Sequence, residues 1–435
     1  MTRLDRLQPF ALQMPMVPAA TVSPQAQAAM EAHMAQGKAK LTGFVQRYLT
    51  WLRGPEGSTA TPEEGQRRFT ILRLRFNAVL TQIDIFSDVV VQRSQHGMGV
   101  WVAGLDALAA DALAPIAPYV DLPPAVCYLD RGVGAAIRRA RTRLPGGDEN
   151  PLAIIRVPRE RMVGSGIAAS LLHEAGHEAS AQLDLVNELR QALLERQHAE
   201  PDKVIAWRYW ERCISEIVAD FWAVALLGLT ATLGLLAVVS LPRAFVFRLS
   251  LDDPHPFPWI RVKLSCALGS VLYPSPQWER VEALWESMYP LEGLPDKSRQ
   301  VIDLLQEEMP RFIGLLTSFR PAKLNGLRVA DVLPMKDRTP ARLAALHEEW
   351  RSQPGRAEQS RPALAFAVLG QARAEGKISP EQESVQLADL LTTWALSSSL
   401  ETSRSCAKQV VSSARRSQTS QGQHSIGLGE RYAIH

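Results

Sequence analysis

The chain has 435 residues, more than one core of ordinary size needs, so we expect two or three packed units. Hydrophobic residues make up 46% and charged residues 21%, which is the balance of a globular protein. The net charge of +3 comes from 48 Lys and Arg against 45 Asp and Glu. A surplus this small over this length gives no reason to expect nucleic acid as a partner.

The four cysteines lie far apart and form no CxxC pair, so we expect reduced, mostly buried thiols. They are Cys127, Cys213, Cys266 and Cys406. The first twenty residues carry charges and then prolines, which does not fit a secretory signal. We therefore expect a cytoplasmic protein.

The N-terminal part is predicted to be an irregular segment, 1–23, followed by a helical domain, 24–115. Ser23-Pro24 and Thr61-Pro62 each place a capping residue before a proline, the usual start of a helix. Each pair predicts a long helix. Glycines at 97–99 are expected to interrupt the second one before a third, shorter helix.

The central part, 116–292, is predicted to hold a small sheet and several helices. Residues 151–158 (PLAIIRVP) are β-branched and bounded by prolines, which indicates a strand, and we place it at the edge of the sheet. Apolar spacing predicts helices over 167–196 and 203–227. The expected fold class is mainly α, with a small sheet and helical extensions at both ends.

One uncharged segment, 221–242, is long enough to span a membrane. Our preferred interpretation is two buried core helices broken near Gly228 and Gly234, because a buried helix is also hydrophobic all round. A membrane-associated protein with this segment in the bilayer is the alternative.

The C-terminal part is predicted to be a helical domain, 293–401, and a disordered tail, 402–435. The tail is rich in Ser, Arg and Gln and poor in large apolar residues. The helical extensions at both ends could bind a protein partner.

Residues 173–177 read His-Glu-Ala-Gly-His, an HExxH motif within an apolar, helix-compatible stretch. On a helix, positions i and i+4 share one face, so His173 and His177 could bind one zinc ion. Glu174 lies on the flank, where it could take a proton from zinc-bound water as that water attacks a carbonyl. The motif alone has accidental matches, and two incidental histidines on a surface helix are the alternative.

A catalytic zinc needs a third protein ligand, and Glu216 is the candidate. Glu216 and Asp220 are one turn apart on a predicted helix that is otherwise largely apolar. Carboxylates on a helix that is otherwise apolar need a charged partner. We expect Glu216 to complete the ligand set and Asp220 to accept a hydrogen bond from the far nitrogen of a ligand histidine.

Downstream, His255-Pro256 is followed by Arg261. HExxH, then ExxxD, then His-Pro with a nearby Arg resembles the gluzincin family of the CAAX prenyl proteases, the heat-shock membrane metalloproteases and their soluble relatives. The resemblance covers roughly 150–275 and implies a zincin-like core over 116–292. It also implies that His255 or Arg261 stabilises the oxyanion; Tyr209 is a weaker candidate. A turn histidine and a structural salt bridge are the alternatives for His255 and Arg261.

The sequence therefore predicts a cytoplasmic zinc endopeptidase acting on a protein or peptide. An extended substrate could pair with the strand at 151–158. The membrane members of that family carry spans that flank the HExxH helix, and the sequence shows none before residue 173. The second hypothesis is an interaction scaffold with a structural or inactive zinc site, because about two-thirds of the chain lies outside the motif region.

Overall fold

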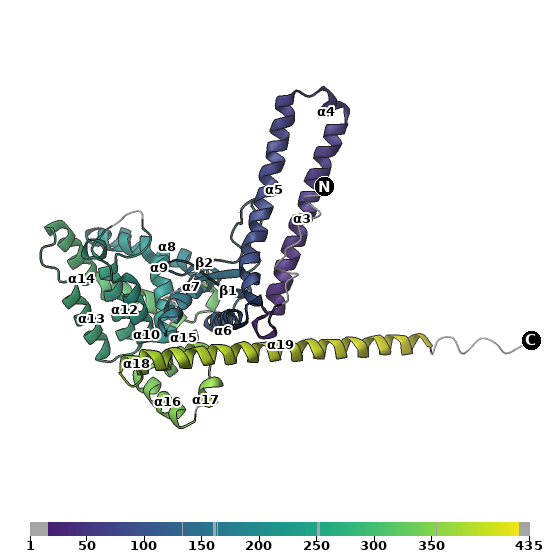
Figure 1. The fold of residues 1–435 in the computed structure, drawn as a ribbon. Coiled ribbons are helices and arrows are strands. Elements are labelled where there is room, and N and C mark those ends of the chain that lie inside the picture. The colour runs from purple at the N-terminus through teal and green to yellow at the C-terminus, as the bar shows by residue number, and fades with distance from the viewer. Residues whose placement is uncertain are drawn as a thin grey trace, which may run out of the picture.

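The computed structural model describes residues 16–132, 134–159, 162, 164–249, 253–353 and 355–425, with side chains described up to 404. The fold is mainly α with one small three-stranded sheet, which confirms the predicted fold class. Figure 1 shows a helical body from which a long hairpin projects, while the last helix, α19, extends beyond the body.

The hairpin consists of α3, α4 and α5, and α6 follows at its base. Their bounds are α3 Pro24–Arg53, α4 Pro55–Thr59, α5 Pro62–Val91 and α6 His96–Leu113. Side-chain oxygens of Ser23 and Thr61 cap α3 and α5, which confirms both predicted helix starts. The predicted break between the second helix and the third is confirmed, but it lies at Gln92–Ser94 and not at the glycines 97–99, which are in the first turn of α6. Gly99 instead allows close packing, since a Cβ there would lie 2.7 Å from the Gln92 carbonyl.

The sheet has the order β1-β3-β2, with β1 Ala125–Asp130, β2 Ala136–Arg138 and β3 Ala153–Pro158. β3 pairs parallel to β1 and antiparallel to β2. The strand predicted at 151–158 is confirmed, but its place at the edge is wrong. Its nearly continuous apolar run is typical of a strand that is covered on both faces and has neighbours on both sides.

Four consecutive helices form the centre of the body: α7 Gly166–Leu183, α8 Leu185–Ala199, α9 Val204–Leu227 and α10 Leu229–Val239. The single helix predicted over 167–196 is wrong, because Asp184 adopts a left-handed conformation with φ 59° and separates α7 from α8. Asp tolerates that conformation better than most residues. The helix predicted over 203–227 is confirmed as α9.

The uncharged segment 221–242 divides into the end of α9, then α10. Gly228, with φ 59°, separates the two helices, and residues 221–232 are buried. Both features confirm the buried-helix interpretation for this stretch. Gly234 does not break α10; a Cβ there would lie 2.3 Å from that of Ala169, so its role is to let α10 approach α7.

A different segment passes a length and composition test for a membrane span. Among the described helical residues, His96–Ile116 is long and apolar enough, and 56% of its most apolar window is buried within the fold. A core helix of a folded domain gives the same result.

The rest of the chain is helical. The longer helices are α12 Pro258–Leu272, α13 Gln277–Met288, α14 Asp296–Ser318, α16 Pro340–Ser352, α18 Pro362–Ala374 and α19 Pro380–Ser425, with short α11 Arg243–Val246, α15 Val329–Val332 and α17 Gly355–Glu358 between them. α19 continues through 402–425 of the segment predicted to be a disordered tail; residues 426–435 lie outside the described part.

One apolar core joins residues from Val102 to Trp394. The domain boundaries predicted at 116 and 293 therefore fall within a single core. α19 lies directly on α6, where a Cβ at Gly104 would come 2.4 Å from the Leu391 carbonyl oxygen.

Three of the cysteines confirm the expectation of buried free thiols: Cys127, Cys213 and Cys266. Burial raises the pKa of Cys213 and Cys266 to about 12. Cys406 lies beyond the described side chains.

Candidate metal centre

Helices α7 and α9 bring two imidazoles and one carboxylate to a common point. His173 Nε2 lies 3.2 Å from Glu216 Oε2, and His177 Nε2 lies 3.4 Å from the same oxygen. One ligand atom from each of the three residues lies within 4.8 Å of the others. These three residues form a group that could hold a metal ion, as the sequence predicted.

The close approach of α7 and α9 depends on Gly176, inside the HExxH motif. A Cβ on this residue would lie 2.8 Å from the Trp222 Cβ and 2.9 Å from the Ala219 Cα, both on α9. Real Cβ atoms do not approach other atoms so closely. Glycine therefore lets the histidine-bearing face of α7 reach the carboxylate on α9.

The observed distances suit a divalent ion. Two ligand atoms that each lie about 2.0–2.1 Å from a tetrahedrally coordinated ion are about 3.3 Å apart. Glu216 Oε2 is buried, and although three imidazole nitrogens lie 3.1–3.4 Å away, none of the described residues meets this oxygen with the geometry of a hydrogen bond. Leaving a buried carboxylate oxygen without a partner is costly, and a cation at this point would remove that cost.

The pKa values of Glu216 and His173 are shifted in opposite directions. Burial would raise the pKa of Glu216, but the surrounding imidazoles outweigh burial and hold that pKa far below its usual value. Burial would likewise lower the pKa of His173, but the hydrogen bond to Asp220 and the nearby carboxylate of Glu216 raise it to about 9. A cation bound here would take the place of that proton.

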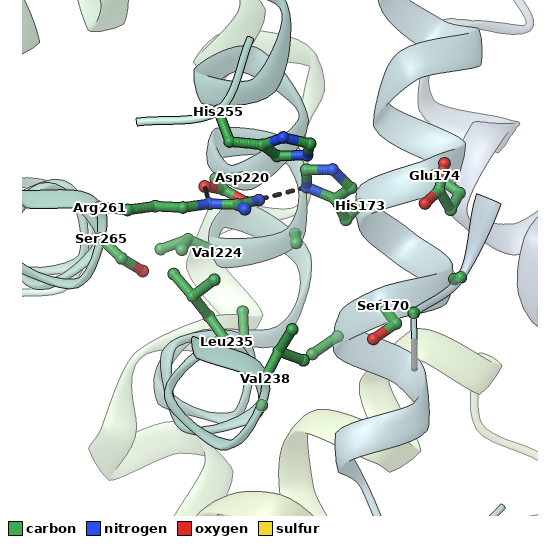
Figure 2. A pocket seen from close by; sticks show the side chains of 16 residues that line it. Ser170, His173, Glu174, Asp220, Val224, Leu235, Val238, His255, Arg261 and Ser265 are labelled. Carbon is green, nitrogen blue, oxygen red and sulfur yellow. Dashed lines mark hydrogen bonds and ion pairs between the residues drawn. The ribbon is translucent and has the colours of Figure 1, made fainter. Parts of the chain in front are cut away.

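Asp220 and Arg261 hold the His173 ring in its orientation (Figure 2). His173 Nδ1 lies 2.8 Å from Asp220 Oδ1, as the sequence predicted, which leaves Nε2 directed at Glu216. Arg261, on α12, donates to both Asp220 oxygens at 2.7 and 2.8 Å. Two of its three guanidinium nitrogens thus bind Asp220, and the oxyanion role that the resemblance implied for Arg261 stays a prediction.

Glu174 lies on the flank of α7, next to the face that carries His173 (Figure 2). Its side chain is buried, with a relative exposure of 8%. Burial raises the pKa of Glu174, and the imidazoles of His173 and His177 oppose this shift only in part. A carboxylate whose pKa is raised toward neutrality is suited to accept and return protons.

His255 approaches the same oxygen from the loop before α12. Its Nε2 lies 3.1 Å from Glu216 Oε2, and its Nδ1 lies 2.7 Å from Asp253 Oδ1. Its side chain is 45% exposed, so this imidazole forms the solvent side of the group. Tyr209 accepts a hydrogen bond from the Phe257 backbone N–H at 2.9 Å and thereby anchors this loop.

A cavity of about 140 Å³ opens beside His173 and Glu174. An apolar cavity of about this size holds one benzene ring, so it could take one side chain. Its wall combines polar groups of the centre with small and branched apolar residues of α7, α9 and α10. The apolar part consists of Ala169, Ala223, Val224, Ala231, Gly234, Leu235 and Val238.

Sequence reasoning missed three contributors: Asp253, Gly176 and the segment Gly134–Ala135, which lines the cavity just before β2. Asp253 could have been found, because an Asp two residues before a His, followed by Pro, favours a turn in which the carboxylate accepts from the backbone N–H. Its Oδ1 does accept from the His255 N–H at 3.0 Å. The other two depend on contacts between distant segments.

Comparisons with known proteins add no identification. No family model, no curated protein and no solved structure matches the chain. Inferences about function therefore depend on the centre itself.

Proposed function

We propose that this protein is a zinc-dependent endopeptidase with a zincin-like core. The observation that carries the proposal is the convergence of His173, His177 and Glu216 on one point, with Glu174 buried on the flank. Two histidines and a glutamate form a ligand set of catalytic zinc sites, which keep a further position open. Bound zinc would supply an activated water and polarise the scissile carbonyl.

Side chains around the zinc would transfer the proton, orient a ligand and stabilise the oxyanion. Glu174 would accept the proton of the attacking water and return it to the leaving amine, which suits its raised pKa. Asp220 would fix the tautomer of His173, and Arg261 would hold Asp220 in place. His255, half exposed at the solvent side, would donate to the developing oxyanion.

The surroundings favour an extended peptide as the substrate. β2 pairs with β3 on one side only, and no described strand pairs with its other edge. Gly134–Ala135, directly before β2, lines the cavity. A peptide could add to the edge of β2 by backbone pairing and place one aliphatic side chain in the cavity.

The test is proteolysis of an unfolded protein, with metal content measured in parallel. We expect chelation to abolish cleavage and added zinc to restore it. Glu174→Gln should keep the metal and lower the turnover rate by about 10²–10⁴-fold. Glu195→Gln, an exposed substitution on α8, is the matched control and should leave turnover unchanged.

Two results would contradict the endopeptidase. One is a Glu174→Gln variant as active as the parent. The other is stoichiometric metal with no cleavage and unfolding on chelation, which would support the zinc-stabilised scaffold instead.

A further inference from the structure

The α3–α5 hairpin projects from the body (Figure 1) and touches it mainly at its base. There His33 Nε2 lies 3.0 Å from Gln82 Oε1, and Gln82 donates to the Pro145 carbonyl at 2.6 Å. Lys40 pairs with Asp148 slightly further out. We call residues 38–76, the outer part of the projection, the distal hairpin.

The distal hairpin carries a clear surplus of positive charge. It contains eight Lys and Arg against three Glu, a surplus of five, whereas the whole chain has a net charge of +3. The rest of the molecule is therefore slightly acidic. This concentration of charge on a projection would attract an anionic surface.

Large apolar side chains are exposed among these charges. Leu52, Phe69, Ile71 and Leu74 have relative exposures of 47, 45, 49 and 64%. On a helix with about 100° between residues, Phe69 points about 140–160° away from Leu74 and Ile71. The exposed apolar residues therefore do not form one flat patch.

Aromatic rings and guanidinium groups are stacked in the same region. Arg47 and Arg75 lie 4.8 and 4.1 Å from the centre of the Phe44 ring, and Arg68 lies 4.4 Å from that of Trp51. Such amphipathic pairs suit an interface at which apolar bodies enter a hydrocarbon layer and charged ends stay at its polar boundary.

We propose that the distal hairpin docks on an anionic phospholipid surface. The positive surplus of the distal hairpin would be attracted to anionic headgroups, and its exposed apolar side chains could enter the boundary of the hydrocarbon layer. A second copy of the hairpin would bring a like positive charge and be repelled. Nucleic acid would satisfy the arginines but would leave exposed aliphatic side chains such as Leu74 in water.

The test is flotation of the full-length protein with vesicles. We expect binding to phosphatidylcholine vesicles that contain phosphatidylglycerol, little binding to pure phosphatidylcholine, and loss of binding in about 1 M salt, where screening acts over about 3 Å. Ile71→Ser with Leu74→Ser, and separately Arg67→Gln with Arg73→Gln, should each weaken binding by at least about tenfold.

Matched controls are Ile205→Ser with Val385→Ser, which are similarly exposed apolar residues, and Lys297→Gln with Arg299→Gln. Both should bind like the parent, and circular dichroism should show all variants folded. The proposal is overturned if anionic vesicles are not bound, or if hairpin and control variants bind equally. It is also overturned if only the arginine substitutions matter and a soluble polyanion binds equally well, because the hairpin would then bind polyanions in general.

Discussion

The candidate metal centre and the distal hairpin both place charged side chains among apolar ones, but the side chains of the centre are mostly buried and those of the hairpin are exposed. At the centre, Asp220 is buried between His173 and Arg261, and the Arg261 side chain is only 11% exposed. In the hairpin, the arginines and apolar residues such as Leu74 face solvent. A buried charged side chain needs its partner and is held in one orientation, which suits a site that binds an ion. Exposure leaves the hairpin residues free to meet a surface outside the molecule.

Removing a charge at the centre should have the largest effect. Asp220→Asn leaves the nearly buried Arg261 without its counter-charge, so we expect a loss of about 3 kcal/mol in the free energy of unfolding. Metal affinity should also fall by about 10–100-fold, because His173 loses its orienting partner. Urea unfolding with a chelator present and competition for a zinc indicator measure the two effects. Asp331→Asn, at an exposed ion pair on α15, should change neither appreciably.

The expected effect on stability and metal affinity together is intermediate at the base of the hairpin, where Arg93 is fully buried just after the end of α5. It donates to Asp106 at 2.7 Å and to the Cys127 carbonyl at 2.6 Å. Arg93→Met should cost about 3 kcal/mol in thermal or urea unfolding, since Asp106 loses its partner. Arg190→Met, at a half-exposed pair with Glu211, is the control. Equal costs would mean that burial does not set the difference between the two regions.

A substitution between two uncharged residues tests the packing of α7 against α9 at the centre. Gly176→Ala forces α7 away from α9, and overpacking of this kind costs about 1–3 kcal/mol. Zinc affinity should fall as well, because His173 and His177 move relative to Glu216. Gly314→Ala on α14, where a Cβ has open space, should be tolerated. Unchanged zinc affinity in Gly176→Ala would show that the approach of the helices is not what assembles the ligands.

The smallest effect is expected at the hairpin surface. Ile71→Ser or Leu74→Ser should change the free energy of unfolding by no more than about 0.5 kcal/mol, because about half or more of each residue is already exposed to water. The same substitutions should weaken vesicle binding. A large loss of stability would mean that these residues pack in the free protein, and the contrast with the buried centre would fail.

The sequence by itself determined the local features. Caps at Ser23 and Thr61 start the hairpin helices, and the i, i+4 spacing of His173 and His177 places both imidazoles on one helical face. These outcomes depend on residues a few positions apart, whose geometry follows from helical periodicity. Glu216 was also correctly paired with the histidines, because a carboxylate in an apolar helix needs a partner.

Only the tertiary structure decided which distant segments meet. It placed β3 at the centre of the sheet, gave β2 the open edge and paired Arg261 with Asp220. It also joined the predicted units in one core. Such contacts depend on the packing of surfaces far apart in the chain, and a local pattern carries no information about which surfaces will pack together.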